Sequence, residues 1–379
     1  MNFEPYPFEK LNNLLQNIEP NQSYTPSTLT IGEPQFETPH FIQDALASHT
    51  DLLKKYPKTS GEENLRKAQK SFIQKRFSLS LEDAQIIPTF GTREVLFNFP
   101  QFLLFDKEEA TLAYTNPFYQ IYEGAAIASR ARSILLNLTQ ENNFTPEVDE
   151  ETLAQCDLVI LNFPNNPTAA TLSRQALGEW VQLALKHNFV LLNDECYSEI
   201  YTSEPTPSLL QASLDVGNES FKNILVINSI SKRSSAPGLR SGFIAGDAEI
   251  LKEYMAYRTY VGCASPLPLQ EAAAAAWLDE EHVATARKVY QENFSLAKEI
   301  LDVEIPQATF YLWIKVTNAL EFTIKLYKEY NVKVLPGEFL ARTNTQGENP
   351  GTDYIRIALV ESTAQTKEVL LRIKECLNG

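Results

Sequence analysis

Three side chains near the middle of the chain have types and spacing that suit a phosphorylated carbonyl compound. They are Lys232, a serine three residues before it (Ser229), and an arginine eight residues after it (Arg240). A lysine amine in a desolvated site forms a Schiff base with a carbonyl group. A hydroxyl and a forked guanidinium hold a phosphate dianion. Because short motifs also match ordinary polar loops by chance, the order of other motifs along the chain must decide.

Buried strands are predicted to position these groups. Residues 223–227, N-I-L-V-I, form a short apolar run typical of a strand buried in a sheet. Lys232 would then follow the carboxyl end of a central strand, where α/β folds bind their ligands. Two similar runs, L-V-I-L-N and F-V-L-L-N-D, lead to Asn166 and to Asp194. A carboxylate buried at a strand end is costly unless it is paired, so Asp194 needs a partner.

The ordered combination of motifs resembles the class I/II aminotransferases, which are fold-type I enzymes dependent on pyridoxal 5'-phosphate. The matching stretches are S-I-S-K-R-S-S-A-P-G-L-R, N-F-P-N-N-P-T, N-D-E-C-Y and Y-I-R-I-A-L-V. The resemblance extends from Gly32 to Arg356, which is nearly the whole chain. It implies an α/β fold with a mainly parallel sheet in a large domain, a smaller α+β domain, and a homodimer with shared active sites. One departure is Ala169, which stands where the family usually has a glycine after N-P-T.

The resemblance implies a role for each cofactor-binding residue. Lys232 is implied to be the catalytic residue that forms the Schiff base with the cofactor. Asp194 is implied to keep the pyridine nitrogen protonated, and Tyr119 to stack on the ring. Asn166 and Tyr197 are implied to hydrogen-bond the phenolic oxygen. The residues implied to bind the phosphate are Gly91, Thr92, Arg93, Ser229, Arg240 and, from the partner chain of the dimer, Tyr56.

Amino-acid and 2-oxo-acid substrates are implied by the same resemblance. Arg356 is implied to grip the substrate α-carboxylate in a bidentate pair, with Gly32 and Asn166 beside it. The stretches P-Y-P-F-E-K-L, G-T-R-E-V-L-F and V-L-P-G-E-F-L-A-R are similar to those of succinyldiaminopimelate aminotransferases of bacterial lysine biosynthesis. Those enzymes use glutamate and N-succinyl-2-amino-6-oxopimelate. Because that acceptor carries a distal carboxylate, a second cation is expected, for which Arg342 and Arg93 are the candidates.

Other functions remain open at this stage. An aspartate-, aromatic- or kynurenine-type aminotransferase of the same fold is the main alternative. A pyridoxal-phosphate lyase acting on cysteine-like substrates is a further one. A cofactor-binding regulator without turnover is disfavoured, because no DNA-binding domain or basic patch is evident in the sequence.

Composition sets the remaining expectations. At 379 residues the chain is expected to divide into a large domain (38–275) and a small domain built from 1–37 and 276–379, with one long helix near 269–301. A net charge of -15 argues against nucleic acid and anionic membranes as partners. The scattered cysteines and histidines predict no metal site, and they favour reduced thiols in a cytoplasmic protein. No apolar stretch is long enough to span a membrane, and no signal peptide is evident.

Overall fold

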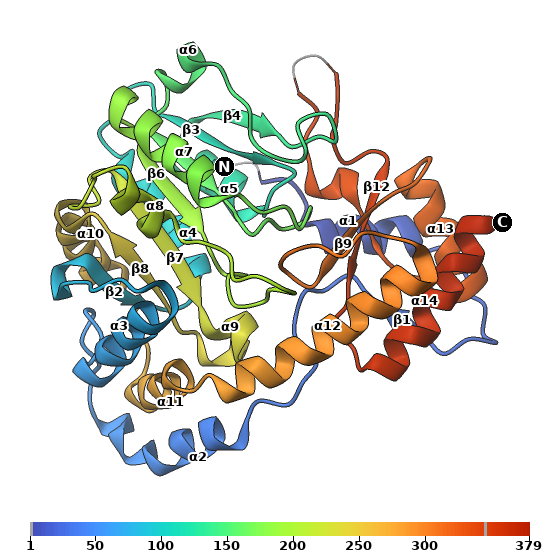
Figure 1. The fold of residues 1–379 in the computed structure, drawn as a ribbon, viewed down its shortest axis with the longest axis horizontal. Helices are drawn as coiled ribbons and strands as arrows, with labels where there is room; N and C mark the ends of the chain where they lie inside the picture. Colours follow the sequence, from blue (N-terminus) through green and yellow to red (C-terminus); the bar gives the residue numbers. More distant parts are fainter. Residues whose placement is uncertain (1–2, 345–346) are drawn as a thin grey trace.

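The computed structural model describes residues 3–344 and 347–379, and its elements gather around separate sheets (Figure 1). The helices are α1 (Pro7–Leu15), α2 (His40–Ser48), α3 (Glu63–Phe77), α4 (Thr92–Leu103), α5 (Ile121–Ala128), α6 (Glu150–Leu153), α7 (Arg174–His187), α8 (Leu209–Asp215), α9 (Ile230–Arg233), α10 (Ala248–Val261), α11 (Leu267–Leu278), α12 (Glu281–Leu301), α13 (Ala319–Tyr330) and α14 (Thr363–Asn378). The strands are β1 (Ser27–Thr28), β2 (Ile86–Thr89), β3 (Thr111–Asn116), β4 (Arg132–Asn137), β5 (Leu158–Leu161), β6 (Val190–Asp194), β7 (Ile224–Ser229), β8 (Gly242–Gly246), β9 (Tyr311–Lys315), β10 (Val332–Lys333), β11 (Leu335–Pro336) and β12 (Tyr354–Ala358).

The large sheet has the strand order β2-β8-β7-β6-β5-β3-β4. The pairs from β7 to β4 are parallel, whereas β8 runs antiparallel to both of its neighbours. Successive side chains of a strand point to opposite faces, so Val226 and Leu225 of β7 enter different hydrophobic cores. Helices cover both faces, which explains why these strands are apolar throughout. The predicted α/β fold with a mainly parallel sheet is confirmed.

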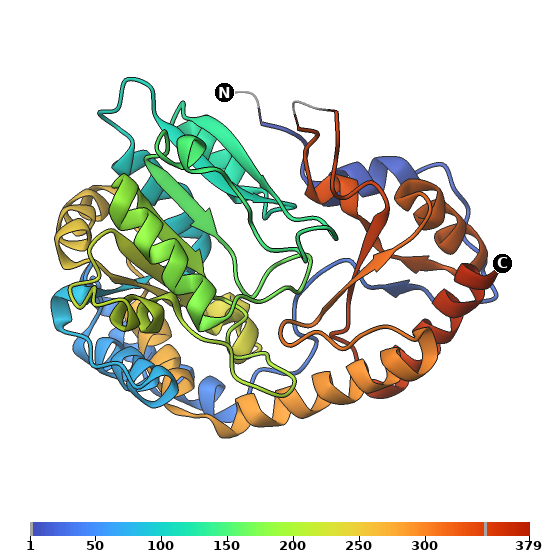
Figure 2. The ribbon, with the colours of Figure 1, turned by 45° about the horizontal axis from the view of Figure 1, so that its top comes forward.

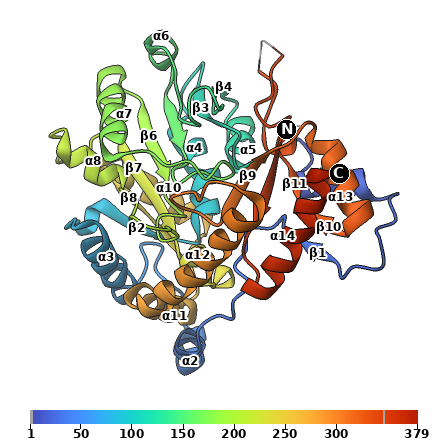
Figure 3. The ribbon, with the colours of Figure 1, turned by 45° about the vertical axis from the view of Figure 1, so that its right-hand side comes forward.

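A smaller group of elements forms around the antiparallel sheet β11-β12-β9 and the parallel pair β1-β10. Its core includes Leu29 from the N-terminal part of the chain and Phe294, Ile355 and Leu370 from the C-terminal part. Figure 3 shows β1 lying beside β10 and α14, so both ends of the chain build this group. We call it the small lobe, and the elements around the large sheet the large lobe.

The prediction of a single helix near 269–301 is wrong, because the chain forms two helices, α11 and α12, with a break at Asp279 and Glu280. The guanidinium of Arg233 binds the carbonyl oxygens of Ala276 and Asp279 at this break, at 2.8 and 3.2 Å. The Asp279 carboxylate then accepts the amide of His282 in the first turn of α12. In Figure 2, α12 (orange) runs from the large lobe to the small lobe.

The domain boundaries stay a prediction. The boundary at 275/276 falls inside α11, where Trp277 packs against Phe72 and Phe243 of the large lobe. Within the residues described, no helix is long and apolar enough to cross a membrane, and no cluster of His, Cys, Asp and Glu side chains could hold a metal ion.

Candidate active site

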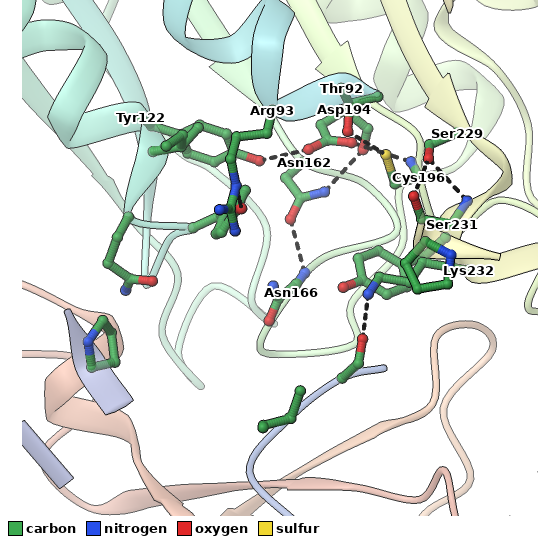
Figure 4. Close-up of a pocket in the computed structure, with 18 of the residues that line it drawn as sticks. Thr92, Arg93, Tyr122, Asn162, Asn166, Asp194, Cys196, Ser229, Ser231 and Lys232 are labelled. Carbon is green, nitrogen blue, oxygen red and sulfur yellow. Dashed lines mark hydrogen bonds between the residues drawn. The ribbon is translucent and has the colours of Figure 1, made fainter. Parts of the chain in front are cut away.

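A cavity of about 830 Å³ lies where the carboxyl ends of the parallel strands face the small lobe. The large lobe contributes the residues that follow β3, β5, β6 and β7, and the small lobe contributes β9, β12 and the start of α1. Figure 4 shows polar side chains of the large lobe, among them Asn166, Asp194 and Lys232, gathered on one side of this cavity. The predicted site residues that line the cavity are Gly32, Thr92, Arg93, Tyr119, Asn166, Asp194, Tyr197, Ser229, Lys232, Arg240 and Arg356.

Lys232 lies on the short helix α9, directly after β7. Ser229 caps this helix, because its Oγ accepts the amide of Ser231 over 3.0 Å. The Lys232 Nζ donates to the carbonyl oxygen of Gly32 across the cavity (Figure 4). A side chain at position 32 is excluded, since a Cβ there would lie 1.7 Å from the Tyr311 Oη. The amine therefore reaches the segment that was predicted to contact the substrate carboxylate.

Asp194 is a buried carboxylate at the end of β6, with 5% of its surface exposed. Its Oδ2 accepts the hydroxyl of Tyr122 over 3.1 Å, and its Oδ1 accepts the amide of Cys196 over 3.2 Å. Burial raises the pKa of Asp194, and the hydrogen bonds and the positive charge of Lys232 oppose that shift only partly. A cationic N–H group beside this carboxylate would offset its desolvation.

A cradle for an anion forms where Arg240 meets the N-terminus of α4. Gly91 precedes this helix with a φ of 75°, and a Cβ there would lie 2.3 Å from the Arg240 Nη2. Burial lowers the pKa of the Arg240 guanidinium, and nearby Arg93 lowers it further. A dianion bound here would relieve both effects, and the amides at a helix N-terminus favour it as well.

Arg356 lies on β12 with 4% of its surface exposed. Its Nη1 donates to Asn166 Oδ1 over 2.7 Å and its Nη2 to the carbonyl of Thr30 over 2.6 Å. Its Nε is buried and has no hydrogen-bond partner among the residues described. The guanidinium also lies over the ring of Tyr311, 4.4 Å from the centroid. The guanidinium lines the cavity, and each Nη carries a second N–H, so this arginine can bind a further acceptor such as a carboxylate.

The aromatic residues predicted for the site also lie in the cavity. The Tyr119 hydroxyl accepts Nε of Arg93 over 2.8 Å, and the Tyr197 hydroxyl lies 3.0 Å from that of Tyr311. The backbone amide of Asn166 donates to the side-chain oxygen Oδ1 of Asn162 over 2.9 Å, which fixes the position of Asn166.

The turn after Asn166 forms even though Ala169 replaces the family's usual glycine. Ala169 adopts the left-handed conformation with a φ of 61°. A hydrogen bond of 3.0 Å from its amide to the Asn165 carbonyl oxygen holds it there. The departure from the family's pattern therefore leaves the loop that carries Asn166 intact.

Three predicted residues lie outside the cavity lining: Gly91, which borders the anion cradle described above, Tyr56 and Arg342. Tyr56 is 100% exposed on the single chain. Arg342 donates Nε and Nη2 to the carboxylate of Glu123, at 2.7 and 2.5 Å, and it packs over the ring of Phe118. Its guanidinium is thus already paired with a carboxylate of the protein.

Some residues of the site carried no role in the sequence analysis. Tyr122 and Tyr311 bind other site residues, yet their aromatic side chains look like ordinary core positions in the sequence. Cys196 lies between Asp194 and Tyr197, and its Sγ is 3.3 Å from the Thr92 hydroxyl. Its position inside the D-E-C-Y motif was the signal that could have identified it.

These residues fit pyridoxal 5'-phosphate. A lysine amine, a buried carboxylate and an anion cradle lie in one cavity, in keeping with the aldehyde, ring nitrogen and phosphate of that cofactor. The fit rests on the donor set and on the space that Gly91 leaves beside Arg240.

Comparisons with known proteins agree with this chemistry. The family model described as "Aminotransferase class I and II" matches residues 27–373. An LL-diaminopimelate aminotransferase of Aquifex aeolicus is 32% identical, over 98% of this chain and 96% of its own length. The crystal structure of aminotransferase AspB from Helicobacter pylori is 51% identical with a TM-score of 0.97, covering 100% of both chains. An aminotransferase structure from Neisseria meningitidis is 40% identical with a TM-score of 0.94, over 99% of this chain and 98% of that one. The chain therefore belongs to the class I and II aminotransferases, and it is a transaminase dependent on pyridoxal 5'-phosphate.

Proposed function

We propose that this enzyme transfers an amino group between glutamate and N-succinyl-2-amino-6-oxopimelate. The observation that carries the proposal is Arg93, which lines the cavity and has no carboxylate partner among the residues described. A long acceptor with a distal carboxylate needs such a cation. Arg342 serves this purpose less well, because it is occupied by Glu123. The cavity volume of about 830 Å³ leaves room for an extended substrate.

The relatives support a substrate of this carbon skeleton. Several proteins with 27–32% identity are named LL-diaminopimelate aminotransferases. Transamination of unsubstituted diaminopimelate is therefore the second candidate. The two candidates differ in the distal succinyl group, so discrimination between them depends on the residue that reads its carboxylate.

In the proposed reaction each residue has a defined task. Arg356 binds the α-carboxylate of each substrate, and its contact with Asn166 fixes the orientation of the fork. Lys232 would take the proton from the substrate α-carbon and deliver it to the C4′ carbon of the cofactor within the same half-reaction, and it would move a proton in the opposite direction in the second half-reaction. Bound pyridoxal phosphate supplies the electron sink for the charge that develops there. Asp194 retains the ring-nitrogen proton that this sink requires, and Tyr122 holds its carboxylate in place.

We further propose a homodimer with shared active sites. Tyr56 is 100% exposed on the single chain, and the large side chains of Leu53 and Tyr260 are 71% and 93% exposed. Large exposed apolar side chains favour association, and association through Tyr56 would bring it to the phosphate cradle of the partner.

The test is a set of half-reactions with the purified holoenzyme, followed by the change in absorbance of the bound cofactor. The donors are glutamate, succinyldiaminopimelate, unsubstituted diaminopimelate, aspartate and an aromatic amino acid. We expect a higher kcat/KM for succinyldiaminopimelate than for diaminopimelate by about ten- to a hundredfold, since a charge-assisted hydrogen bond contributes about 1.5–3 kcal/mol. Preference for the unsubstituted compound would support the second candidate. Efficient use of aspartate or an aromatic amino acid instead would refute both.

The residue that reads the succinyl group is tested in the same assay. Arg93→Gln is expected to lower kcat/KM for succinyldiaminopimelate while leaving the diaminopimelate half-reaction nearly unchanged. Arg342→Gln, with Glu123→Gln as its matched control, is expected to affect both substrates equally. Equal losses for Arg93→Gln would place that residue in the phosphate site instead.

A further inference from the structure

The chain passes between the two lobes at two places, which we call the crossings. The first crossing is residues 33–39, between the small lobe and α2, and the second is residues 279–282, which comprise the break after α11 and the first two residues of α12 (Figure 2). Each of the three residues after Lys232 forms a hydrogen bond with a crossing. We call these three interactions the crossing contacts.

The crossing contacts involve consecutive residues but separate partners. Arg233 binds the carbonyl of Asp279 over 3.2 Å and the carboxylate of Glu280 over 2.7 Å. The Ser234 Oγ lies 2.9 Å from Nε2 of His282. The carbonyl oxygen of Ser235 accepts the hydroxyl of Thr38 over 2.7 Å. Helix α9, which carries Lys232, is thus bonded to the second crossing through Arg233, and the two residues after it bond to both crossings.

His282 has the geometry of an oriented group rather than of a free surface histidine. Its Nδ1 faces the Asp279 carboxylate at hydrogen-bond distance, so this nitrogen carries the proton and donates. The Nε2 of the neutral ring therefore accepts the hydroxyl of Ser234. Burial, together with the positive charge of Arg233, lowers the pKa of His282, although Asp279 opposes the shift. The neutral ring with this tautomer is accordingly the form present near neutral pH.

The order serine, histidine, aspartate also occurs in nucleophilic triads, but that chemistry is excluded here. Ser234 is 1% exposed, and it does not line the neighbouring cavity of about 460 Å³. No substrate can reach its oxygen. That cavity is bounded by Phe36, Phe41 and His282, so unfilled space lies beside both crossings.

We propose that His282 and Ser234 are positioning residues that couple the placement of the lobes to the position of Lys232. When the crossings shift, the hydrogen bond from Ser234 to His282 transmits the movement to the C-terminal end of α9, two residues from the lysine. Asp279 keeps His282 in the tautomer that accepts this bond. The lysine amine then reaches its working position only with the lobes in the matching arrangement.

Paired variants of the holoenzyme test this coupling. In His282→Gln the amide oxygen can replace Nε2 as the acceptor for Ser234, whereas in His282→Asn the shorter side chain reaches only toward Asp279. We expect Ser234→Ala and His282→Asn to lower kcat of the glutamate half-reaction about tenfold, because a slightly misplaced reacting group costs that much or more. Their KM for glutamate should change little, and the pH midpoint of the bound cofactor's absorbance should shift.

His282→Gln should retain most of the activity. Thr285→Ala, which lines the same cavity on α12, is the control and should behave as wild type.

The inference rests on the proposed role of Lys232, and its failure is distinguishable from failure of that role. Wild-type kcat and an unshifted midpoint in Ser234→Ala and His282→Asn would overturn the coupling while leaving Lys232 unaffected. The coupling would also be overturned if kcat fell only in proportion to a lowered melting temperature and His282→Gln were as impaired as His282→Asn. Recovery of function in His282→Gln alone, with melting temperatures equal among the variants, would support it.

Discussion

The Nη1 of Arg356 donates to Oδ1 of Asn166 over 2.7 Å, although the two residues are 190 positions apart in the sequence. Arg356 belongs to the small sheet, whereas Asn166 follows β5 of the large sheet. The hydrogen bond therefore joins the small lobe to the large lobe across the cavity. It also leaves the Nε of Arg356 buried without a partner among the described residues.

Replacing Arg356 by lysine tests the carboxylate site. Lysine keeps the charge but loses the fork, so kcat/KM is expected to fall by roughly 2–4 kcal/mol of transition-state binding, about 30- to 1000-fold. Both half-reactions should lose equally, because each places an α-carboxylate in the same position. Steady-state kinetics measure kcat/KM for each substrate, and circular dichroism shows whether the variant is folded. A loss confined to one substrate would contradict the assignment.

Mixing two inactive chains tests the shared active site. Tyr56→Phe and Lys232→Ala chains should form hybrids with one doubly impaired site and one intact site. Activity should therefore reappear on mixing if Tyr56 serves the partner's cofactor. Hybrids that are confirmed by mass spectrometry yet remain inactive would rule out this arrangement.

The anion cradle predicts a specific effect at Gly91. Gly91→Ala and the control Gly217→Ala place alanine at similar φ angles, 75° and 80°, but only position 91 has neighbours within 4 Å of the new Cβ. Gly217→Ala should lose about 1–2 kcal/mol of stability from its positive φ, and Gly91→Ala about 1–3 kcal/mol, because a φ of 75° with a ψ of 168° is a region that glycine almost alone adopts. Only Gly91→Ala should also bind pyridoxal phosphate more weakly, by about tenfold or more. Equal cofactor affinity in the two variants, measured by equilibrium titration, would show that the cradle tolerates a side chain.

The buried carboxyl of Glu195 predicts how stability depends on pH. Burial raises the pKa of Glu195 to about 7, although its hydrogen bonds from Leu209 and Ser208 oppose the shift. A raised pKa means that the folded state favours the protonated carboxyl. The contribution of Glu195 to the free energy of unfolding is therefore complete below the unfolded pKa of about 4.5, and it is lost as the pH rises through 7. Between pH 5 and pH 8, the free energy of unfolding of the wild type should fall by up to about 3 kcal/mol relative to that of Glu195→Gln. The free energy of unfolding of both proteins is measured with denaturant at each pH. If it changed equally with pH in the two proteins, the proposed effect of Glu195 would be refuted.

The sequence predicted the parts of the site that depend on strand ends. Asp194, Asn166 and Lys232 each follow an apolar run, and parallel strands bring such ends to one edge of a sheet. The Tyr197–Tyr311 and Tyr122–Asp194 contacts escaped prediction, because they depend on how distant elements pack. The break between α11 and α12 was missed for the same reason. The break is held by Arg233, a residue more than 40 positions away, and by the Asp279 carboxylate at the break, which accepts the amide of His282.

The assignment of Lys232 is tested most directly by borohydride reduction of the holoenzyme, followed by mass spectrometry of its peptides. We predict that the wild-type peptide containing Lys232 gains the mass of the reduced cofactor. Lys232→Ala should remain folded, bind the cofactor only reversibly, and lose transaminase activity. A covalent cofactor adduct that persists in Lys232→Ala, or that maps to another lysine in wild type, would contradict the assignment on which the proposed reaction depends.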